Sequence, residues 1–201
     1  MTSSQNEIAW FSGRGNTGIG TEGDFGRYKP DVVTPGTFVV GGRSTQWDKA
    51  AYYGAIDPAY TDELTKLNDG LGGFYRYESG TSMSAASVSG TLALMQEFFQ
   101  TYFNTRPSPA LLKALLINGA RSVGPAYDFQ VRNTINYQGW GLVRLQNSLH
   151  PTITNSSALQ TTSMRFFEQS PETALATGQS VTRYVKLANN ARSFPLRATL
   201  V

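Results

Sequence analysis

The stretch GTSMSAASVSGTLALMQEFF, residues Gly80 to Phe99, decides the fold of this chain. Its apolar residues recur at alternating intervals of three and four positions, which is the spacing of one face of an α-helix. The residues on that face are Ala85, Val88, Leu92, Met95 and Phe99. The pattern therefore predicts a helix that begins near Met83 and turns this face towards a hydrophobic core.

Ser82 stands at the predicted N-terminus of this helix, directly after Gly80 and Thr81. Backbone N–H groups at a helix N-terminus point outward, where they can stabilise negative charge that develops on a bound group. A serine there can act as a nucleophile, and the small Ala85 and Ala86 would let a substrate backbone come close. Serine is also a favoured N-cap residue, so the same local pattern fits a simple helix cap.

A second helix is predicted between Ser108 and Gly119. Ser108 is a suitable cap, Pro109 suits the first helical position, and Gly119 is expected to stop the helix. Because the residues between them are apolar nearly all round, this helix should be buried.

Short strands are expected earlier in the chain, at residues 8–11, 31–33 and 37–40. A glycine-rich loop over residues 13–26 is not followed by the GK[ST] signature or by a helix pattern, so a nucleotide site is not expected. The long connection over residues 41–79 should carry some structure of its own, with one or two helical turns at 62–67.

The character of the sequence changes after residue 150. A Gly-Trp-Gly turn at residues 139–141 is followed by a stretch rich in threonine and serine. Apolar residues then alternate over 181–187 and 196–200, and a period of two indicates half-buried strands. A domain boundary is therefore expected between residues 150 and 165.

Composition excludes several classes of protein. The 201 residues are 40% hydrophobic and 15% charged, which is typical of a globular domain, and the net charge of +3 without a basic run argues against nucleic-acid binding. With no cysteine, disulfides, thiolate metal sites and a cysteine nucleophile are excluded. The longest uncharged stretch holds too many serines to span a bilayer, so no membrane partner is expected, and the N-terminal residues do not form a signal peptide.

The sequence GTSMSAASVSG, residues Gly80 to Gly90, resembles the serine motif GTSMAAPHVAG of subtilisin-like serine proteases, the subtilases. It departs from that motif at Ala86, where proline is usual, and at Ser87, where histidine is common. Three further segments resemble the family in the right order. They are FSGRG at residues 11–15 (FSSRGP), KPDVVTPGT at 29–37 (KPDVVAPGT), and the closing pair PSPALLKALLINGA at 107–120 and GWGLV at 139–143.

This resemblance implies an α/β fold: the C-terminal half of a three-layer subtilisin-like domain with a mostly parallel sheet, followed by a partial antiparallel β-sandwich. Residues 1–150 would be the C-terminal part of the catalytic domain, and residues 160–201 the start of the sandwich. The implied activity is that of a serine endopeptidase acting on polypeptides through an acyl-enzyme on Ser82. Gly80, Thr81 and Met83 would line the substrate and oxyanion region.

Other parts of a subtilase site are expected upstream of this sequence. In the family the Asp and His motifs, and the Asn that completes the oxyanion hole, all precede the serine. His150 is the only histidine and follows Ser82, so it is not expected to be the general base. The chain alone is therefore expected to be an inactive fragment whose partner is the upstream part of the same domain. The resemblance also implies a secreted or extracellular enzyme.

No cofactor is expected, and no metal is assigned. Secreted subtilases often bind calcium, but the acidic residues here show no EF-hand spacing. The acids considered are Asp24, Asp31, Asp48, Asp57, Asp62 and Glu63.

Two alternatives stay open from the sequence. The chain could come from a pseudoprotease or structural scaffold that kept the serine loop without the rest of the site. A carbohydrate- or surface-binding module is a third possibility, which rests on residues 165–201 alone.

Overall fold

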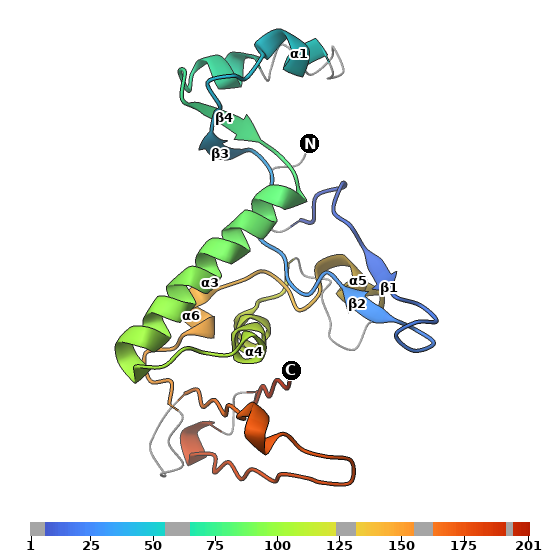
Figure 1. The fold of residues 1–201 in the computed structure, drawn as a ribbon, viewed down its shortest axis with the longest axis vertical. Helices are drawn as coiled ribbons and strands as arrows, with labels where there is room; N and C mark the ends of the chain where they lie inside the picture. The colour runs from blue at the N-terminus through green and yellow to red at the C-terminus, as the bar shows by residue number, and fades with distance from the viewer. Residues whose placement is uncertain (1–6, 55–64, 124–131, 155–162, 192–194) are drawn as a thin grey trace.

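The computed structural model describes residues 7–54, 65–123, 132–154, 163–191 and 195–201 (Figure 1). Its central feature is the long helix α3, with the β3–β4 hairpin at its N-terminal end and α4 and α6 beside its C-terminal half. The strands are β1 (Gly15–Thr17), β2 (Arg27–Lys29), β3 (Val39–Gly42) and β4 (Tyr75–Glu78). The helices are α1 (Lys49–Gly54), α3 (Thr81–Phe103), α4 (Pro109–Gly119), α5 (Arg132–Gln138) and α6 (Leu145–Ser148), with short 3₁₀ turns at Pro171–Thr173 and Asn189–Ala191.

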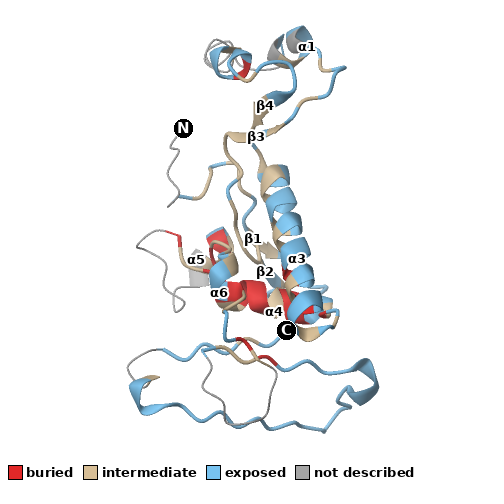
Figure 2. Cartoon of the chain, turned by 90° about the vertical axis from the view of Figure 1, so that its left-hand side faces the viewer, coloured by how far each residue is buried: buried red, intermediate tan, exposed pale blue. Residues whose placement is uncertain are grey.

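Helix α3 forms where its apolar spacing predicts, but only part of the predicted face is buried. Met95 and Phe99 are fully buried, Val88 and Leu92 are half-buried, and Ala85 is exposed. The N-terminal half of the helix therefore lies largely open, while the C-terminal half enters the core (Figure 2).

Helix α4 agrees closely with its sequence signals. Ser108 is the N-cap, and its Oγ accepts a hydrogen bond from the Leu111 N–H at 3.1 Å. Pro109 occupies the first helical position. Gly119 is the last residue of the helix rather than the residue after it, and α6 packs so closely there that a Cβ on Gly119 would lie 2.3 Å from Ser148 Oγ.

The hydrophobic core lies between the C-terminal half of α3, α4 and two residues later in the chain, Ile153 and Phe166. Its aromatic part is built on Phe99, whose ring meets Phe166 edge-on at a centroid distance of 5.2 Å and Phe103 at 5.4 Å. The buried members of the core are Met95, Phe99, Leu111, Leu112, Leu115, Leu116, Ile153 and Phe166. Ile153, within the predicted boundary region 150–165, and Phe166, just after it, thus share this core, and the division into two domains stays a prediction.

The sheets are small and antiparallel. β1 pairs with β2, and β3 pairs with β4 in the register Val39 to Glu78 and Gly42 to Tyr75. Parallel pairing among the described residues is confined to two isolated bridges, from Val33 to Leu142 and from Thr154 to Arg165. The mixture of helices with small sheets agrees with an α/β class, but the described residues do not form the expected mostly parallel sheet.

Several expected strands are corrected by the structure. Residues 8–11 form a turn, in which the Ser12 N–H donates to the Ala9 carbonyl at 3.0 Å, and residues 31–33 reach only the single bridge at Val33. The strand expected at 37–40 is shifted to β3. A short apolar run becomes a strand only where another backbone pairs with it. Among the described residues nothing pairs with 8–11, and 31–33 pair only briefly with the segment 140–143. Of the helical turns expected at 62–67, residues 65–67 are helical and the rest lie outside the described residues.

The strands expected at 181–187 and 196–200 are also wrong. The described backbone there joins no ladder, and Val181, Val185 and Leu196 are exposed. Alternating apolar and polar residues indicate which side chains would share a face of a strand. A strand also needs a neighbouring strand to pair with, and no described segment pairs with these residues. This end of the chain returns to α4, where Arg197 Nη1 donates to the Asn118 and Ala120 carbonyls at 2.6 and 2.8 Å.

Candidate active site

Ser82 is the second residue of α3, at the junction between the β4 strand and the helix. Gly80 is the N-cap, its backbone is extended, and no side chain caps the first turn. The first N–H groups of a helix have no carbonyl four residues earlier within the helix, and Ser82 lies among these first residues. The Ser82 side chain is exposed, and its Oγ has no hydrogen-bond partner within the described part of the chain. The predicted position of Ser82 is therefore confirmed; its role is not tested by geometry alone.

The residues expected to line this region lie next to Ser82. Thr81 is exposed and Met83 is half-buried. The Met83 N–H donates to the Gly80 carbonyl at 3.2 Å, which closes the turn that carries Ser82. The Met83 sulfur lies back over Gly80, because a Cβ built there would meet it at 3.7 Å.

The segment Thr34–Phe38 runs beside the first turn of α3 and is hydrogen-bonded to it at several points. Thr34 Oγ1 donates to the Ser84 carbonyl at 2.8 Å, and Ser84 Oγ donates to the Thr34 carbonyl at 3.0 Å. The Gly80 N–H donates to the Gly36 carbonyl at 2.7 Å. These contacts join residues more than forty positions apart in the sequence, and the motif reading did not single out Thr34, Gly36 or Ser84.

Phe38 carries backbone strain beside the site. Its φ of 51° lies in the left-handed region, which a bulky residue adopts only when its surroundings impose it. The Phe38 N–H donates to Ser79 Oγ at 2.9 Å, and the Phe38 ring meets Tyr77 edge-on at 6.4 Å. Ser79 is only three residues before Ser82, so this strained turn fixes the approach to the helix.

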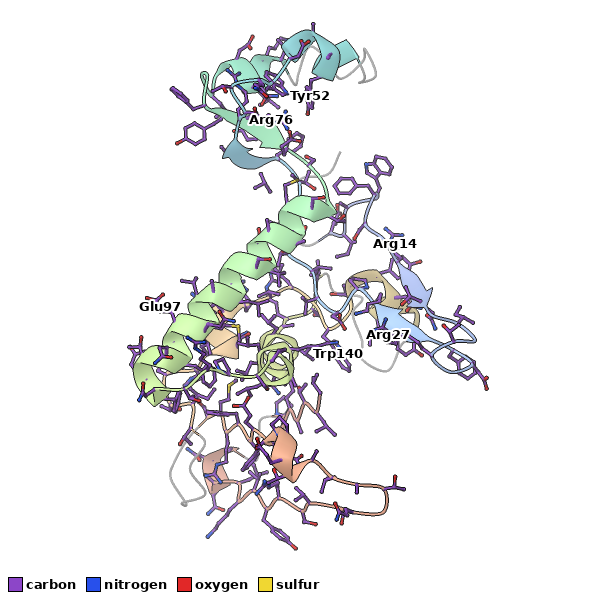
Figure 3. All side chains as sticks on the ribbon, in the orientation of Figure 1. Arg14, Arg27, Tyr52, Arg76, Glu97 and Trp140 are labelled. Carbon is purple, nitrogen blue, oxygen red and sulfur yellow. The ribbon has the colours of Figure 1, made fainter. Side chains whose placement is uncertain are left out.

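The described part of the connection between β3 and β4 forms a small lobe with an aromatic centre. The guanidinium of Arg76 lies over the rings of Trp47 and Tyr52, at 5.5 and 5.2 Å from their centroids, and pairs with Glu78 (Figure 3). Cation–π contacts of this kind stabilise a lobe that has few aliphatic residues. The sequence predicted structure in this long connection, but not α1 or this cluster.

His150 lies away from the Ser82 turn. Its Nδ1 is within hydrogen-bond distance of Thr152 Oγ1 at 3.1 Å and of Ser163 Oγ at 2.5 Å. Both partners belong to the segment after α6, on the far side of the core from the start of α3. His150 therefore takes part in a local polar cluster, as the order of the residues in the sequence led us to expect.

Of the acidic residues considered as calcium ligands, Asp24 is exposed, whereas Asp31 and Asp48 have other contacts. Asp31 forms ion pairs with Lys29 and Lys113, and Asp48 Oδ1 accepts from the Ala50 N–H at 2.8 Å at the start of α1. Within the described ranges, no three histidine, aspartate or glutamate side chains gather as a metal site would require. Asp57, Asp62 and Glu63 lie outside the described residues.

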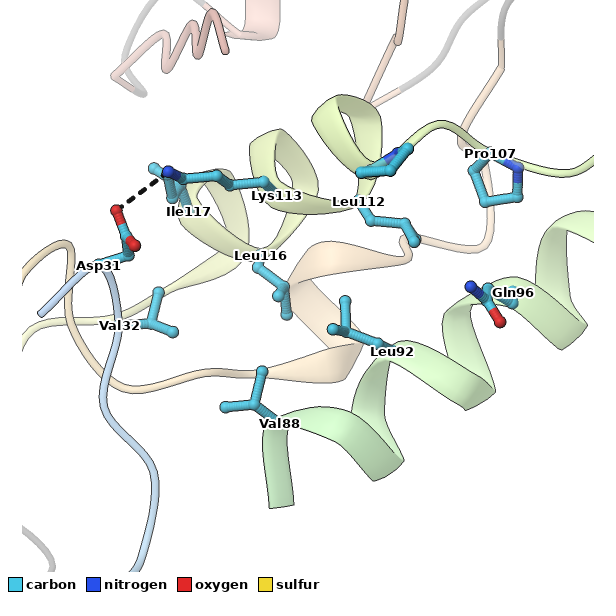
Figure 4. Close-up of a pocket in the computed structure, with 11 residues that line it drawn as sticks. Asp31, Val32, Val88, Leu92, Gln96, Pro107, Leu112, Lys113, Leu116 and Ile117 are labelled. Carbon is cyan, nitrogen blue, oxygen red and sulfur yellow. Dashed lines mark ion pairs between the residues drawn. The ribbon is translucent and has the colours of Figure 1, made fainter. Parts of the chain in front are cut away.

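An apolar groove of about 410 Å³ runs between α3 and α4, with Asp31 and Lys113 at one edge (Figure 4). It begins at Val88, six residues after Ser82 along α3, so it is separate from the serine turn. The residues that line it are Asp31, Val32, Val88, Leu92, Gln96, Pro107, Pro109, Leu112, Lys113, Leu116 and Ile117. As for bilayers, no described helix has both the length and the apolar character to cross one.

Comparison with known proteins gives a consistent assignment. The sequence model of the subtilase family, peptidase S8, matches residues 1–141. The chain is 30% identical over 174 residues to the serine protease/ABC transporter B family protein tagB of Dictyostelium discoideum, and 28% identical over 169 residues to tagD, which carries the same description. These matches cover 75% and 73% of this chain, which spans about 8% of the length of each of these curated relatives.

The family match includes the serine turn, the segment 29–37 that holds it, and the close of α4. It covers more than half of the chain, and the relatives are described as serine proteases. The motif resemblance in the sequence is therefore confirmed: this chain belongs to the subtilase family of serine proteases.

Proposed function

We propose that this chain is the nucleophile-bearing part of a serine endopeptidase, with Ser82 as the nucleophile. The observation that carries the proposal is the exposed Ser82 side chain at the uncapped N-terminus of α3, within the subtilase serine motif. A nucleophile must be reachable by its substrate, and a free helix N-terminus offers donors for negative charge.

In the proposed reaction, Ser82 Oγ attacks the carbonyl carbon of a peptide bond while a base takes its proton. The tetrahedral oxyanion accepts a hydrogen bond from the Ser82 N–H, with Gly80, Thr81 and Met83 around it. Proton transfer to the leaving amine releases it and leaves an acyl-Ser82 ester, which water then hydrolyses. The resemblance implies that the base, its aspartate and the asparagine donor come from the upstream part of the same domain, since His150 is held by Thr152 and Ser163.

The finer features of the fold belong to the same proposal. We propose that Val33 and Leu142, whose bridge is parallel, lie at the edge of the parallel sheet of a complete three-layer domain. The exposed N-terminal half of α3 would then be covered by that domain. The resemblance alone supports the start of a β-sandwich after residue 160, since the strands expected there do not form among the described residues. The resemblance also supports a secreted enzyme that acts on polypeptides without a cofactor.

A fluorophosphonate probe tests the nucleophile directly, because it forms a stable covalent bond with activated serines only. We expect the full-length protein to be labelled at Ser82, as mapped by peptide mass spectrometry, and to hydrolyse casein. Ser82→Ala should lose both the label and the hydrolysis. Residues 1–201 alone should show neither, because a serine without a positioned base is a poor nucleophile.

Ser87→Ala is the matched control. Ser87 is an exposed serine on the same helix, and its Oγ donates to the Met83 carbonyl at 3.0 Å. Its loss should leave labelling and hydrolysis unchanged. A full-length protein that is folded but is neither labelled nor able to cleave casein would contradict the enzyme proposal and favour the structural scaffold. Labelling of residues 1–201 at Ser82 would show that a base lies within this chain.

A further inference from the structure

Ser84 bonds differently from the next three hydroxyl residues along α3. Ser87, Ser89 and Thr91 each donate to the carbonyl four residues earlier, within their own helix. Ser84 instead donates out of the helix, to the Thr34 carbonyl at 3.0 Å. A serine hydroxyl in a helix usually donates its hydrogen bond to a carbonyl of the same helix. The Ser84 hydroxyl instead donates to a separate segment of the chain.

Thr34 returns the same kind of bond. Its Oγ1 donates to the Ser84 carbonyl at 2.8 Å, so the two residues exchange side chain-to-backbone bonds in both directions. The two hydroxyls and two carbonyls form a closed polar pair, which we term the Thr34–Ser84 clasp. Both residues are half-buried, and buried polar groups cost free energy when they lose a partner.

Gly36 shows how closely the two segments approach. A Cβ on Gly36 would lie 2.2 Å from Ser84 Oγ and 2.8 Å from the Gly80 carbonyl oxygen, so this position has no room for a side chain. The Gly80 N–H also donates to the Gly36 carbonyl at 2.7 Å. The clasp therefore continues a contact that reaches both sides of Ser82, from Gly80 before it to Ser84 after it.

The clasp also accounts for two places where this sequence differs from the family motifs. Thr34 stands where KPDVVAPGT has alanine, and Ser84 stands where GTSMAAPHVAG has alanine. The two departures lie fifty residues apart in the sequence, yet they meet in the structure. An alanine at either position would lack the hydroxyl that donates a hydrogen bond to the other residue's backbone carbonyl.

We propose that Thr34 and Ser84 are positioning residues for the nucleophile: their reciprocal hydrogen bonds hold the first turn of α3 so that Ser82 keeps one reactive orientation. This inference rests on the proposed function, because it concerns the same serine. Neither residue touches the reacting atoms, and each acts through the backbone of the turn. A displacement of about 1 Å at a reacting group can cost a large factor in rate, so such a clasp has a direct effect on turnover.

The test uses Thr34→Val in the full-length protein, because valine keeps the branched shape and removes the hydroxyl. Thr34→Ser keeps the hydroxyl and should rescue. Thr91→Val is the matched control, since it removes a hydroxyl-to-carbonyl bond of 2.9 Å on the same helix that joins no second segment. Two quantities are measured: the rate constants for fluorophosphonate reaction at Ser82, and amide hydrogen exchange of the peptide spanning residues 80–86.

We expect Thr34→Val to slow the inactivation step roughly three- to tenfold, as the loss of one hydrogen bond would, with little change in probe affinity. Exchange in residues 80–86 should be faster, while Thr34→Ser and Thr91→Val should match the wild type in both measurements. Equal rates and equal exchange in Thr34→Val and Thr91→Val would overturn the clasp. An unreactive wild type would overturn Ser82 as nucleophile, and with it the positioning role, even if exchange still showed that the clasp orders the turn.

Discussion

Asp31 lies at the edge of the apolar groove, where its carboxylate is shared by two lysines. Lys29 and Lys113 both form ion pairs with it, and the distance from Lys113 Nζ to Asp31 Oδ1 is 3.2 Å. Partial burial raises the pKa of Asp31, but the hydrogen bonds and charges of Lys29 and Lys113 outweigh it, so the pKa lies below its usual value of 3.8. The charged form is thus favoured more in the folded than in the unfolded chain.

A lowered pKa gives Asp31 a defined effect on stability. Its contribution is fully present above the unfolded pKa of 3.8 and is lost as the pH falls from there through the folded pKa. We expect the wild type to be more stable than Asp31→Asn at pH 7, with the difference in unfolding free energy shrinking below about pH 4. Urea denaturation of the full-length protein at a series of pH values measures this. In the Lys29→Met/Lys113→Met background the difference should be much smaller, and a difference that grew in acid would contradict the assignment.

The Gly-Trp-Gly turn connects three separate segments of the chain. The Trp140 N–H donates to the Asp31 carbonyl at 2.9 Å, and Leu142 exchanges backbone hydrogen bonds with Arg121. Gly139 and Gly141 have φ values of 57° and 113°. A Cβ on Gly139 would lie 2.1 Å from the Pro30 carbonyl oxygen, and one on Gly141 would lie 2.1 Å from that of Arg121.

These two glycines should therefore be far less replaceable than glycines that only adopt a positive φ. We expect Gly139→Ala and Gly141→Ala each to destabilise the fold by more than about 3 kcal/mol, because strain and a clash with backbone add together. Gly72→Ala is the control: its φ is 70°, but open space surrounds its Cβ position, so the cost should be about 1–2 kcal/mol. Comparable losses at Gly72 and Gly141 would show that close packing is not what fixes the turn.

The sequence predicted the helices better than the strands, for a physical reason. A helix satisfies its backbone within one segment, so the spacing from Val88 to Phe99 and the Ser108 cap were enough to locate α3 and α4. A strand depends on a partner elsewhere in the chain, and the alternation over 181–187 contains no information about one. The same limit applied at the site. The motif was enough to identify Ser82, whereas the role of Thr34 and Gly36 is visible only in the folded structure, where they contact the turn that carries Ser82.

Much apolar surface stays open when this chain is taken by itself. The groove between α3 and α4 is lined largely by apolar side chains, and Leu94, also on α3, is 52% exposed. Several aromatic side chains are more exposed than Leu94, among them Trp10, Phe25, Phe74 and Tyr102. Open apolar surface of this extent is typical of a binding face or of a chain that aggregates.

We expect residues 1–201 alone to self-associate and to unfold without a sharp transition. Both strands of each small sheet have an unpaired edge, and the exposed apolar groups favour contact between copies. Sedimentation velocity over a range of concentrations, with the binding of a hydrophobic dye, measures the association. The full-length protein should bind fewer moles of dye per mole of protein than residues 1–201 alone. A monomeric chain with a sharp, reversible transition would show that these residues form a self-sufficient domain.

Helix α3 is packed into the core at its C-terminal end and carries Ser82, the proposed nucleophile, at its N-terminal end, where the Thr34–Ser84 clasp holds it. Its firm grip begins at Met95, thirteen residues from Ser82, which is about 20 Å along the axis. A pivot of only about 3° at that grip would swing Ser82 through about 1 Å. Loosening the packing around Phe99 would therefore first pull on the Thr34–Ser84 clasp and displace Ser82, before the core itself unfolds.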